Sequence, residues 1–320
     1  MILCYHGIAQ DDEHEWDSDL YINQQRLRER LLALRDGGYT VLPLADAARR
    51  LYEGTLPSRS VAITFDDGAT DFERMALPVL REFNAHATLY LSTYYCFTRL
   101  PVFNTILRYV MWKGRASGGD LRAVLEASAP VPVASRDDQV RAWTLAQELV
   151  KRQNLSAEEK DQLVSRVAEV LNVNYASIKQ RGILGYMSPD VVRALPRDLV
   201  DVQLHTHRHR TPRDEALFKR EVTDNIDRVA ELRGPDDLVH FCYPSGDYHG
   251  EFLPWLRDCG VKYATTCIPE LASRESDPLL LPRLVDTMPQ SQLAFESWLS
   301  GFAMVLPRKR RYRLDALRLE

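Results

Sequence analysis

The stretch Val61-Ala-Ile-Thr-Phe-Asp-Asp-Gly68 is an apolar run that ends in two adjacent carboxylates and a glycine. Side chains alternate along a strand, so two consecutive Asp residues serve one site only where the strand ends between them and the chain turns, as Gly68 permits. Carboxylates this close repel each other unless a cation or a shared proton relieves the repulsion. The pair therefore predicts a metal ligand beside a general base, with an ordinary Asp-Gly turn as the alternative.

A histidine cluster, Leu204-His-Thr-His-Arg-His-Arg210, follows a second apolar run at residues 199–202. It holds three of the eight histidines of the chain. Neutral imidazoles together with one carboxylate are a normal shell for catalytic Zn²⁺, with a position left open for water. Strand periodicity by itself favours His205 and His207 as the pair on one face.

Together, the two segments resemble the NodB-homology polysaccharide deacetylases, carbohydrate esterase family 4. The matching motifs are Thr-Phe-Asp-Asp-Gly at 64–68 and His-Thr-x-x-His at 205–209. The resemblance implies that Asp66 is the catalytic base, and it favours His209 over His207 as a ligand of a divalent metal, expected to be Zn²⁺. The metal ligands that it implies are Asp67, His205 and His209.

The third motif of this family, Arg-x-Pro-[Phe/Tyr], is altered in this chain. The segment Phe241-Cys-Tyr-Pro-Ser-Gly246 has Cys242 at the position of the arginine that orients the base. This form is similar to the Tyr-Pro-x-Gly motif of the poly-N-acetylglucosamine deacetylase branch. We expect Arg283 to supply the missing guanidinium, and the Ser245 N–H to stabilise the oxyanion. The residues expected on the substrate side are Tyr243, Pro244, Ser245 and Arg283.

The last motif of the family ends in a catalytic histidine near the C-terminus, but this sequence has no histidine after His249. The same branch is circularly permuted and begins with an apolar strand that ends in Tyr-His, which resembles Ile2-Leu-Cys-Tyr-His-Gly7. The resemblance implies that His6 is the general acid that protonates the departing amine. A strand-end histidine bonded to backbone is the alternative.

Short apolar runs alternate with helical periodicities along most of the chain. The expected strands are 2–6, 61–65, 87–91, 200–204, 239–243, 262–266 and 279–285. Helical spacing of apolar residues occurs at 24–35 and 71–83, each shortly before the next strand. This order predicts an α/β fold with a mostly parallel sheet, a distorted (β/α)7 barrel of the polysaccharide deacetylase type. In such barrels functional residues gather at the C-terminal ends of the strands.

The 320 residues are sufficient for a single deacetylase-like barrel domain with additions. Residues of about 100–186 lack a strand pattern and contain a capping-box signal at Ser156-Ala-Glu-Glu159, which predicts a helical insertion. A basic C-terminal tail covers about 307–320. Short basic runs are more often solvated tails, and contact of the segment 307–313 with an anionic membrane surface is the alternative.

The composition of the chain limits the classes of binding partner and the cellular compartment that we expect. The net charge of −4, from 41 basic and 45 acidic residues, gives no reason to expect a nucleic acid, whereas a neutral or mildly charged glycan is compatible with it. The five cysteines are widely spaced, which is typical of reduced thiols in the core. The N-terminal residues lack the basic region of a secretion signal. We therefore expect a cytoplasmic protein, with peripheral contact to a membrane.

These observations predict a metal-dependent hydrolase of amide bonds, which removes N-acetyl groups from an N-acetylated sugar in a polysaccharide or glycan precursor. One alternative is a metallophosphoesterase or amidohydrolase that uses the His-x-His cluster for two or three metals. Another is a catalytically degenerate barrel that binds carbohydrate. The number of metal ions bound per chain distinguishes the three hypotheses.

Overall fold

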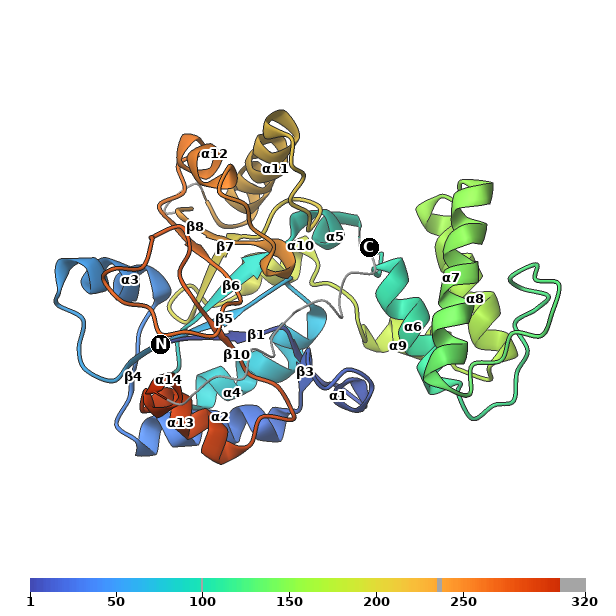
Figure 1. Ribbon diagram of the computed structural model, residues 1–320, viewed down its shortest axis with the longest axis horizontal. Coiled ribbons are helices and arrows are strands. Elements are labelled where there is room, and N and C mark those ends of the chain that lie inside the picture. The colour runs from blue at the N-terminus through green and yellow to red at the C-terminus, as the bar shows by residue number, and fades with distance from the viewer. Residues whose placement is uncertain (99, 235–237, 306–320) are drawn as a thin grey trace.

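A parallel sheet forms the centre of the computed structural model, which describes residues 1–98, 100–234 and 238–305 (Figure 1). The order of its strands is β10-β1-β5-β6-β7-β8-β9, and a short strand β4 pairs with β5 beside this path. The strands are β1 Ile2–Tyr5, β4 Thr40–Val41, β5 Ser60–Phe65, β6 Ala87–Leu91, β7 Val200–Leu204, β8 His240–Cys242, β9 Tyr263–Thr265 and β10 Leu284–Val285. The basic tail expected at 307–320 lies outside the described residues.

The sheet curls so that its two ends approach each other through one segment of the chain. Leu281 bridges Thr265 in β9, and three residues later Leu284 pairs with Leu3 in β1. Every strand pair in the path is parallel. The prediction of a distorted seven-stranded barrel of the deacetylase type is therefore confirmed.

Both faces of the strands are covered, which explains their nearly continuous apolar sequences. All six residues of β5 are buried, as are all five of β6. Helices surround the sheet in Figure 1, and α2 buries Leu27, Leu31 and Leu34 against it as its sequence spacing predicts. These helices are α2 Gln24–Asp36, α3 Leu44–Glu53, α4 Leu77–Glu82, α10 Pro189–Ala194, α11 Glu215–Arg233, α12 Phe252–Asp258 and α13 Gln292–Leu299.

Four of the helices between β6 and β7 form a lobe beside the barrel (Figure 1). They are α6 Phe103–Lys113, α7 Arg136–Gln153, α8 Ala157–Val170 and α9 Tyr175–Arg181, whereas α5 Thr93–Thr98 lies against the barrel. Helices α6 to α9 pack around a hydrophobic cluster of their own, and the capping box of Ser156 and Glu159 is present at the start of α8. Ion pairs from Lys113 to Asp12 (2.8 Å) and from Arg181 to Asp11 (3.1 Å) connect the lobe to the loop after β1.

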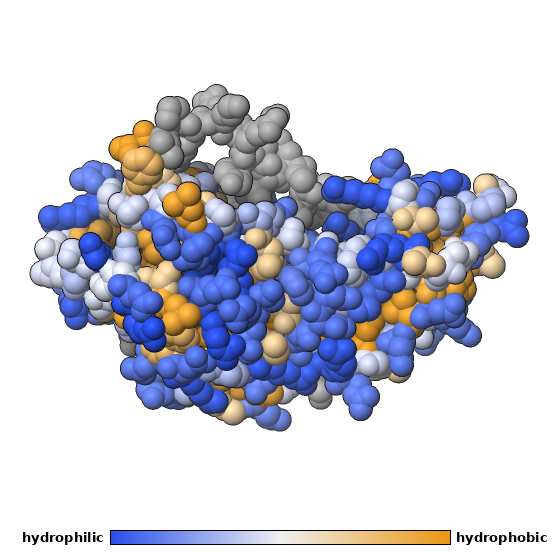
Figure 2. Space-filling model, turned by 90° about the horizontal axis from the view of Figure 1, so that it is seen from below, coloured by the Kyte–Doolittle hydropathy of each residue, from blue (hydrophilic) through white to orange (hydrophobic). Residues whose placement is uncertain are grey.

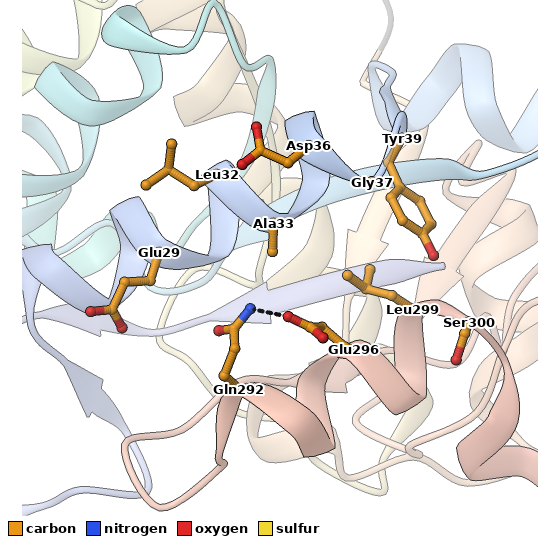
Figure 3. A pocket seen from close by; sticks show the side chains of 10 residues that line it. All are labelled: Glu29, Leu32, Ala33, Asp36, Gly37, Tyr39, Gln292, Glu296, Leu299 and Ser300. Carbon is orange, nitrogen blue, oxygen red and sulfur yellow. Dashed lines mark hydrogen bonds between the residues drawn. The ribbon is translucent and has the colours of Figure 1, made fainter.

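The surface shows no wide apolar area on the face seen in Figure 2, where apolar residues occur in small separate groups. Among the described residues, no helix has the length and apolarity needed to cross a membrane. A hollow of about 670 Å³ lies between α2 and α13 (Figure 3). None of the candidate site residues lines this hollow.

Candidate active site

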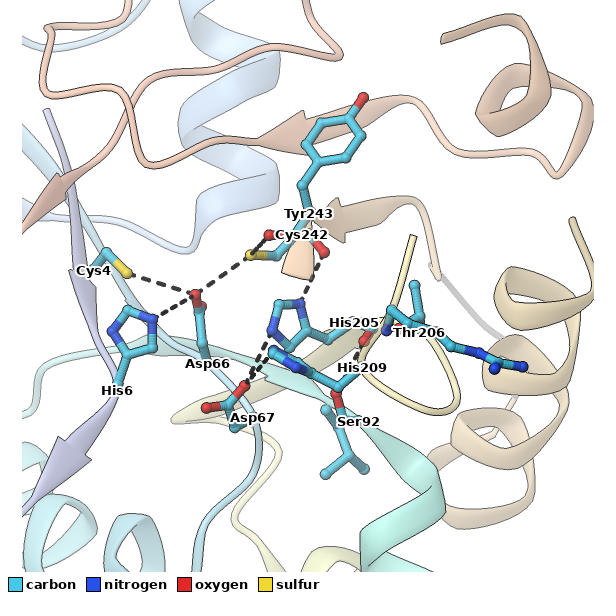
Figure 4. A network of polar contacts seen from close by, with 12 residues as sticks. Cys4, His6, Asp66, Asp67, Ser92, His205, Thr206, His209, Cys242 and Tyr243 are labelled. Carbon is cyan, nitrogen blue, oxygen red and sulfur yellow. Dashed lines mark hydrogen bonds and ion pairs between the residues drawn. The ribbon is translucent and has the colours of Figure 1, made fainter. Parts of the chain in front are cut away.

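The two carboxylates of the opening motif lie in a turn at the C-terminal end of β5. Asp67 has a φ of 69° and Gly68 a φ of 88°, so the chain reverses direction directly after Asp66. A Cβ atom at position 68 would lie 2.3 Å from Leu91 Cδ1, which leaves room only for glycine. Because of this turn, both carboxylates point into one cluster of polar side chains instead of to opposite faces (Figure 4).

Other left-handed residues lie in the loops of the same cluster. Thr206, His209 and Ser245 have φ values of 58°, 55° and 56°. Such backbone conformations cost of the order of 1–3 kcal/mol each and persist where the surrounding structure holds them. The loops after β7 and β8 are therefore strained at the positions that carry the second and third motifs.

Three possible ligand atoms converge at Asp67. Its Oδ1 lies 3.2 Å from His205 Nε2 and 3.1 Å from His209 Nε2. This oxygen is buried and accepts no hydrogen bond from any residue in the described ranges. Tetrahedral coordination at 2.0–2.2 Å separates ligand atoms by about 3.3 Å, so the spacing fits an ion such as Zn²⁺.

Hydrogen bonding of the His205 ring supports this interpretation. Its Nδ1 lies 2.8 Å from the carbonyl oxygen of Cys242, which only accepts hydrogen bonds. The proton of a neutral ring is then on Nδ1, and Nε2 directs a lone pair at the Asp67 carboxylate. A cation bound between His205 Nε2 and the Asp67 carboxylate would remove the repulsion between the lone pair and the negative charge.

His207 lies apart from the candidate metal ligands. Its Nδ1 is 2.9 Å from Thr93 Oγ1, and its ring packs edge-on against Tyr94. The structure thus brings His209, and not His207, to Asp67. The left-handed φ of His209 explains why the strand periodicity of two does not apply at this position.

Helix α11 shapes the histidine loop through two polar residues that sequence reasoning missed. The buried Asn225 accepts a hydrogen bond from the His205 N–H and donates to the Leu91 carbonyl and to Thr93 Oγ1. Glu221 binds Arg208 and Arg210 on the other side of the loop. Both polar residues are buried within a helix that also buries Phe218, Val222 and Val229. The sequence did carry a signal for these two residues, because Glu221 and Asn225 are polar residues four positions apart on an otherwise apolar helix face.

Asp66 is held by a buried arginine. Arg283 donates from Nη1 to Asp66 Oδ1 and from Nη2 to Oδ2, both at 2.7 Å, and also donates to the Thr266 carbonyl. Burial raises the pKa of Asp66, but the Arg283 charge and hydrogen bonds outweigh it and hold the pKa below its usual value. Asp66 is therefore ionised at neutral pH.

The position of Arg283 supports one expectation and corrects another. Its guanidinium lies on Asp66, where the resembled family has the arginine of its third motif. Arg283 is fully buried, however, so its side chain is not on the substrate side as expected. Its strongest contacts are the two hydrogen bonds to Asp66, so we expect it to act through that carboxylate.

His6 lies at the end of β1, beside Asp66. Its Nε2 is 3.8 Å from Asp66 Oδ2, and its side chain is 20% exposed. Its Nδ1 is buried and has no hydrogen-bond partner in the described part of the chain. An imidazole that faces a carboxylate and is partly exposed can exchange a proton with a ligand bound beside it.

At the third-motif turn, the backbone faces the site, whereas the side chain of Tyr243 does not. Tyr243 is fully buried, its hydroxyl donates to the Leu279 carbonyl, and Figure 4 shows its ring directed away from the cluster. The place of Tyr243 on the substrate side thus rests on the backbone of the turn and not on its side chain. Pro244 is buried, whereas Ser245 is exposed at the left-handed position of the turn.

A small cavity of about 50 Å³ adjoins the cluster. His6 and Asp67 line it from the barrel, while Thr105 of α6 and Leu184 line it from the helical lobe. Aromatic residues lie at its edge, where Tyr186 stacks on Tyr95 with ring centroids 4.9 Å apart. The lobe between β6 and β7 therefore forms one wall of the candidate site.

Comparison with known proteins agrees with these features. Residues 53–107 match the family model described as polysaccharide deacetylase. A segment of 91 residues is 33% identical to the "Putative polysaccharide deacetylase YxkH" of Bacillus subtilis (strain 168), and this match spans 28% of the chain and 30% of that relative.

Solved deacetylase structures share the fold over most of their length. The Streptococcus pyogenes deacetylase PplD, solved in complex with acetate, has a TM-score of 0.62 at 18% identity, with 93% of this chain and 96% of that one covered. The de-N-acetylase from Aggregatibacter actinomycetemcomitans has a TM-score of 0.58 at 12% identity, with coverage of 93% and 98%. IcaB from Ammonifex degensii has a TM-score of 0.56 at 17% identity, with coverage of 93% and 96%.

At these identities the structural likeness establishes only the fold, whereas the family model includes the Asp-Asp-Gly motif itself. This chain is therefore similar to polysaccharide deacetylases in the segment that contains the Asp-Asp-Gly motif, and it shares its fold with the solved structures over most of its length.

Proposed function

We propose that this protein is a metal-dependent hydrolase that removes N-acetyl groups from an N-acetylated sugar in a polysaccharide or glycan precursor. The observation that carries the proposal is the pair of adjacent carboxylates with different partners. Asp67 faces two histidine nitrogens, whereas Asp66 is bound by Arg283 and faces His6. This division provides a cation site directly beside a proton-transfer site.

The ligand set fits Zn²⁺, with Asp67, His205 and His209 as its holders. When bound, such an ion supplies Lewis-acid chemistry, because it polarises a carbonyl and lowers the pKa of water. The protein residues hold the remaining parts of the reaction. Of these, the Ser245 N–H is our candidate donor to the oxyanion that develops on the acetyl oxygen.

Asp66 is the proposed general base. Its ionised carboxylate takes the proton of the attacking water, and Arg283 keeps it fixed in orientation. His6, as imidazolium, then protonates the departing amine. Since His6 follows the first strand, this assignment also proposes the circularly permuted motif order.

The cavity beside His6 is the proposed entry for the acetylated sugar. Its lining combines the two site residues with apolar and aromatic side chains, the combination typical of sites that bind small ligands. We propose that the lobe at about 100–186 is an insertion that walls this side of the substrate site. Residues 307–313 are proposed to contact an anionic membrane surface near a lipid-linked substrate.

The Arg283 contact disfavours the phosphoesterase alternative. Enzymes of that type hold two or three ions, and a second ion here would share Asp66. Both oxygens of Asp66 already accept from a guanidinium, whose positive charge repels a further cation.

The test is acetate release from a panel of N-acetylated oligosaccharides and sugar conjugates, with metal-loaded and chelator-treated protein compared. We expect release only by the loaded protein, which should bind about one ion per chain. Hydrolysis of a sugar phosphate without acetate release would replace the proposal with the phosphoesterase. A protein that releases no acetate, hydrolyses no sugar phosphate and binds no metal would instead be a carbohydrate-binding protein.

A further inference from the structure

Three cysteines from distant parts of the sequence surround the Asp66–Arg283 pair. Cys4 Sγ and Cys242 Sγ lie 3.6 Å and 3.4 Å from Asp66 Oδ2. Arg283 Nη2 lies 2.9 Å from Cys242 Sγ and 3.6 Å from Cys267 Sγ. The proposed reaction uses none of these thiols, so their position beside the catalytic carboxylate requires another explanation.

Exposure distinguishes the three thiols. Cys4 and Cys242 are fully buried, whereas Cys267 is partly exposed and is followed by the exposed Ile268. A small oxidant in solvent therefore reaches Cys267 first. Cys4 and Cys267 contact opposite members of one ion pair. Cys4 Sγ lies 3.6 Å from Asp66 Oδ2, Cys267 Sγ lies 3.6 Å from Arg283 Nη2, and these two atoms of the pair are 2.7 Å apart.

The surroundings of Cys267 favour its thiolate, the reactive form of cysteine. The hydrogen bond from Cys4 and the charge of Arg283 lower the pKa of Cys267 to about 6, against the opposing effect of burial. The other partly exposed cysteine, Cys259 at the end of α12, differs in this respect, because burial raises its pKa. The chain thus contains a matched control.

We propose that Cys267 and Cys4 form an oxidation-sensitive dithiol site beside the catalytic carboxylate, at which a peroxide converts the two thiols to a disulfide. The Cys267 thiolate attacks the O–O bond of hydrogen peroxide, an S–O bond forms, and hydroxide leaves and becomes water. The sulfur is oxidised by two electrons to a sulfenic acid, and the peroxide is reduced. The Cys4 sulfur then attacks the sulfenic sulfur, an S–S bond forms, and a second hydroxide leaves with the Cys4 proton as water.

Disulfide formation would disturb both sides of the proposed reaction. The two sulfurs must close to about 2.05 Å, which draws them across the Asp66–Arg283 pair. On its other side, Cys267 packs on the third-motif turn, since a Cβ on Gly246 would lie 3.3 Å from Cys267 Sγ. Oxidation therefore moves the groups that hold Asp66 and the Ser245 N–H, while the three proposed metal ligands include no cysteine.

The test treats metal-loaded full-length protein with hydrogen peroxide, removes the peroxide with catalase, and then measures intact mass, disulfide-linked peptides, bound metal and acetate release. The wild type should lose about 2 Da, yield a Cys4–Cys267 linked peptide and retain its metal. It should also lose most of its acetate release, which dithiothreitol should restore. Activity is compared with that of the same variant before treatment.

Variants test the assignment of each sulfur. Cys267→Ser should form no linked peptide and keep most of its own activity, whereas Cys259→Ser should respond as the wild type does. In Cys4→Ser the oxidation should stop at the sulfenic acid of Cys267, which a dimedone-type reagent labels.

Equal inactivation of Cys267→Ser and wild type, or a disulfide that links Cys242 instead of Cys4, would overturn the inference. The activity readout rests on the proposed function, but the peptide mapping does not. A protein that releases no acetate yet forms the Cys4–Cys267 link would refute only the function, and one that releases acetate without forming the link would refute only the dithiol site.

Discussion

The two halves of the candidate site are built in different ways, although they begin at neighbouring residues of one turn. The cation half consists of Asp67, His205 and His209, of which Asp67 and His209 are 27% and 31% exposed in their side chains. The proton-transfer half is centred on Asp66, which is 3% exposed and bound to the fully buried Arg283. The environments of two adjacent carboxylates thus assign them separate tasks.

The comparison shows that the proposed cation half is partly accessible and has no counter-charge from any Arg or Lys that the structure describes, whereas the buried half has the guanidinium of Arg283. Asp67 Oδ1 has no hydrogen-bond donor within the described residues, but both oxygens of Asp66 have one. If this difference is functional, changes in the two halves should separate metal binding from turnover. The four predictions below run from the largest expected effect to the smallest.

The largest effect is expected from His209→Ala, in the cation half. Loss of one of three ligands should reduce the bound metal well below one ion per chain and acetate release to background. Metal analysis after gel filtration, together with the acetate assay, measures both. His86→Ala, which alters a partly exposed histidine just before the N-terminal end of β6, is the control and should keep metal and activity. Full metal content in His209→Ala would show that His209 is not a metal ligand and would refute the proposed cation half of the site.

Asp66→Asn tests the proton-transfer half. We expect kcat to fall by about 10²–10⁴-fold while the metal remains bound, because the amide cannot accept the proton of water. The control is Asp71→Asn, which neutralises another buried carboxylate near the site and should retain activity. Loss of metal from Asp66→Asn would show that Asp66 is a ligand and that the two halves are one.

Arg283→Lys should shift the pH dependence instead of abolishing activity. Arg283 lowers the pKa of Asp66, so a weaker partner lets this pKa rise, and the protonated, inactive form appears at higher pH. The acid limb of the kcat/KM profile should therefore move to higher pH than in the wild type. Arg30→Lys is a matched control, since Arg30 is also fully buried and pairs with Asp286 outside the site. An unshifted acid limb in Arg283→Lys would show that Arg283 does not set the pKa of the general base.

The smallest effect concerns Asp71 and the stability of the fold. Burial, followed by the charge of Glu13, holds the pKa of Asp71 well above its usual value. The folded state thus retains the Asp71 proton to higher pH than the unfolded state, and stability falls as pH rises from the unfolded pKa toward the folded one. Asp71→Asn should raise the free energy of unfolding at pH 7 by about 1 kcal/mol or more, and have less effect near pH 4. Denaturant unfolding at both pH values measures this, and an equal effect at both would refute the assignment.

Much of the fold was predictable because its signals are local. The apolar runs at 61–65, 87–91 and 200–204 lie within strands β5, β6 and β7, as their buried sequences require. The capping box at Ser156 also acts within a few residues of chain. The site was predictable only through motif spacing, and periodicity by itself would have chosen His207 over His209. The periodicity argument fails here because His209 has a left-handed φ, which ends the alternation of side chains.

By itself, the sequence determined the barrel and the candidate residues at the strand ends, because strand patterns and motif chemistry are encoded in short segments. Only the tertiary structure decided the partners of these residues. It brought Arg283 onto Asp66 across 217 positions of the chain, placed Asn225 behind His205, and gathered Cys4, Cys242 and Cys267 around the same ion pair. These contacts depend on how the parallel strands close into a barrel, because closure brings the C-terminal ends of the first and last strands together.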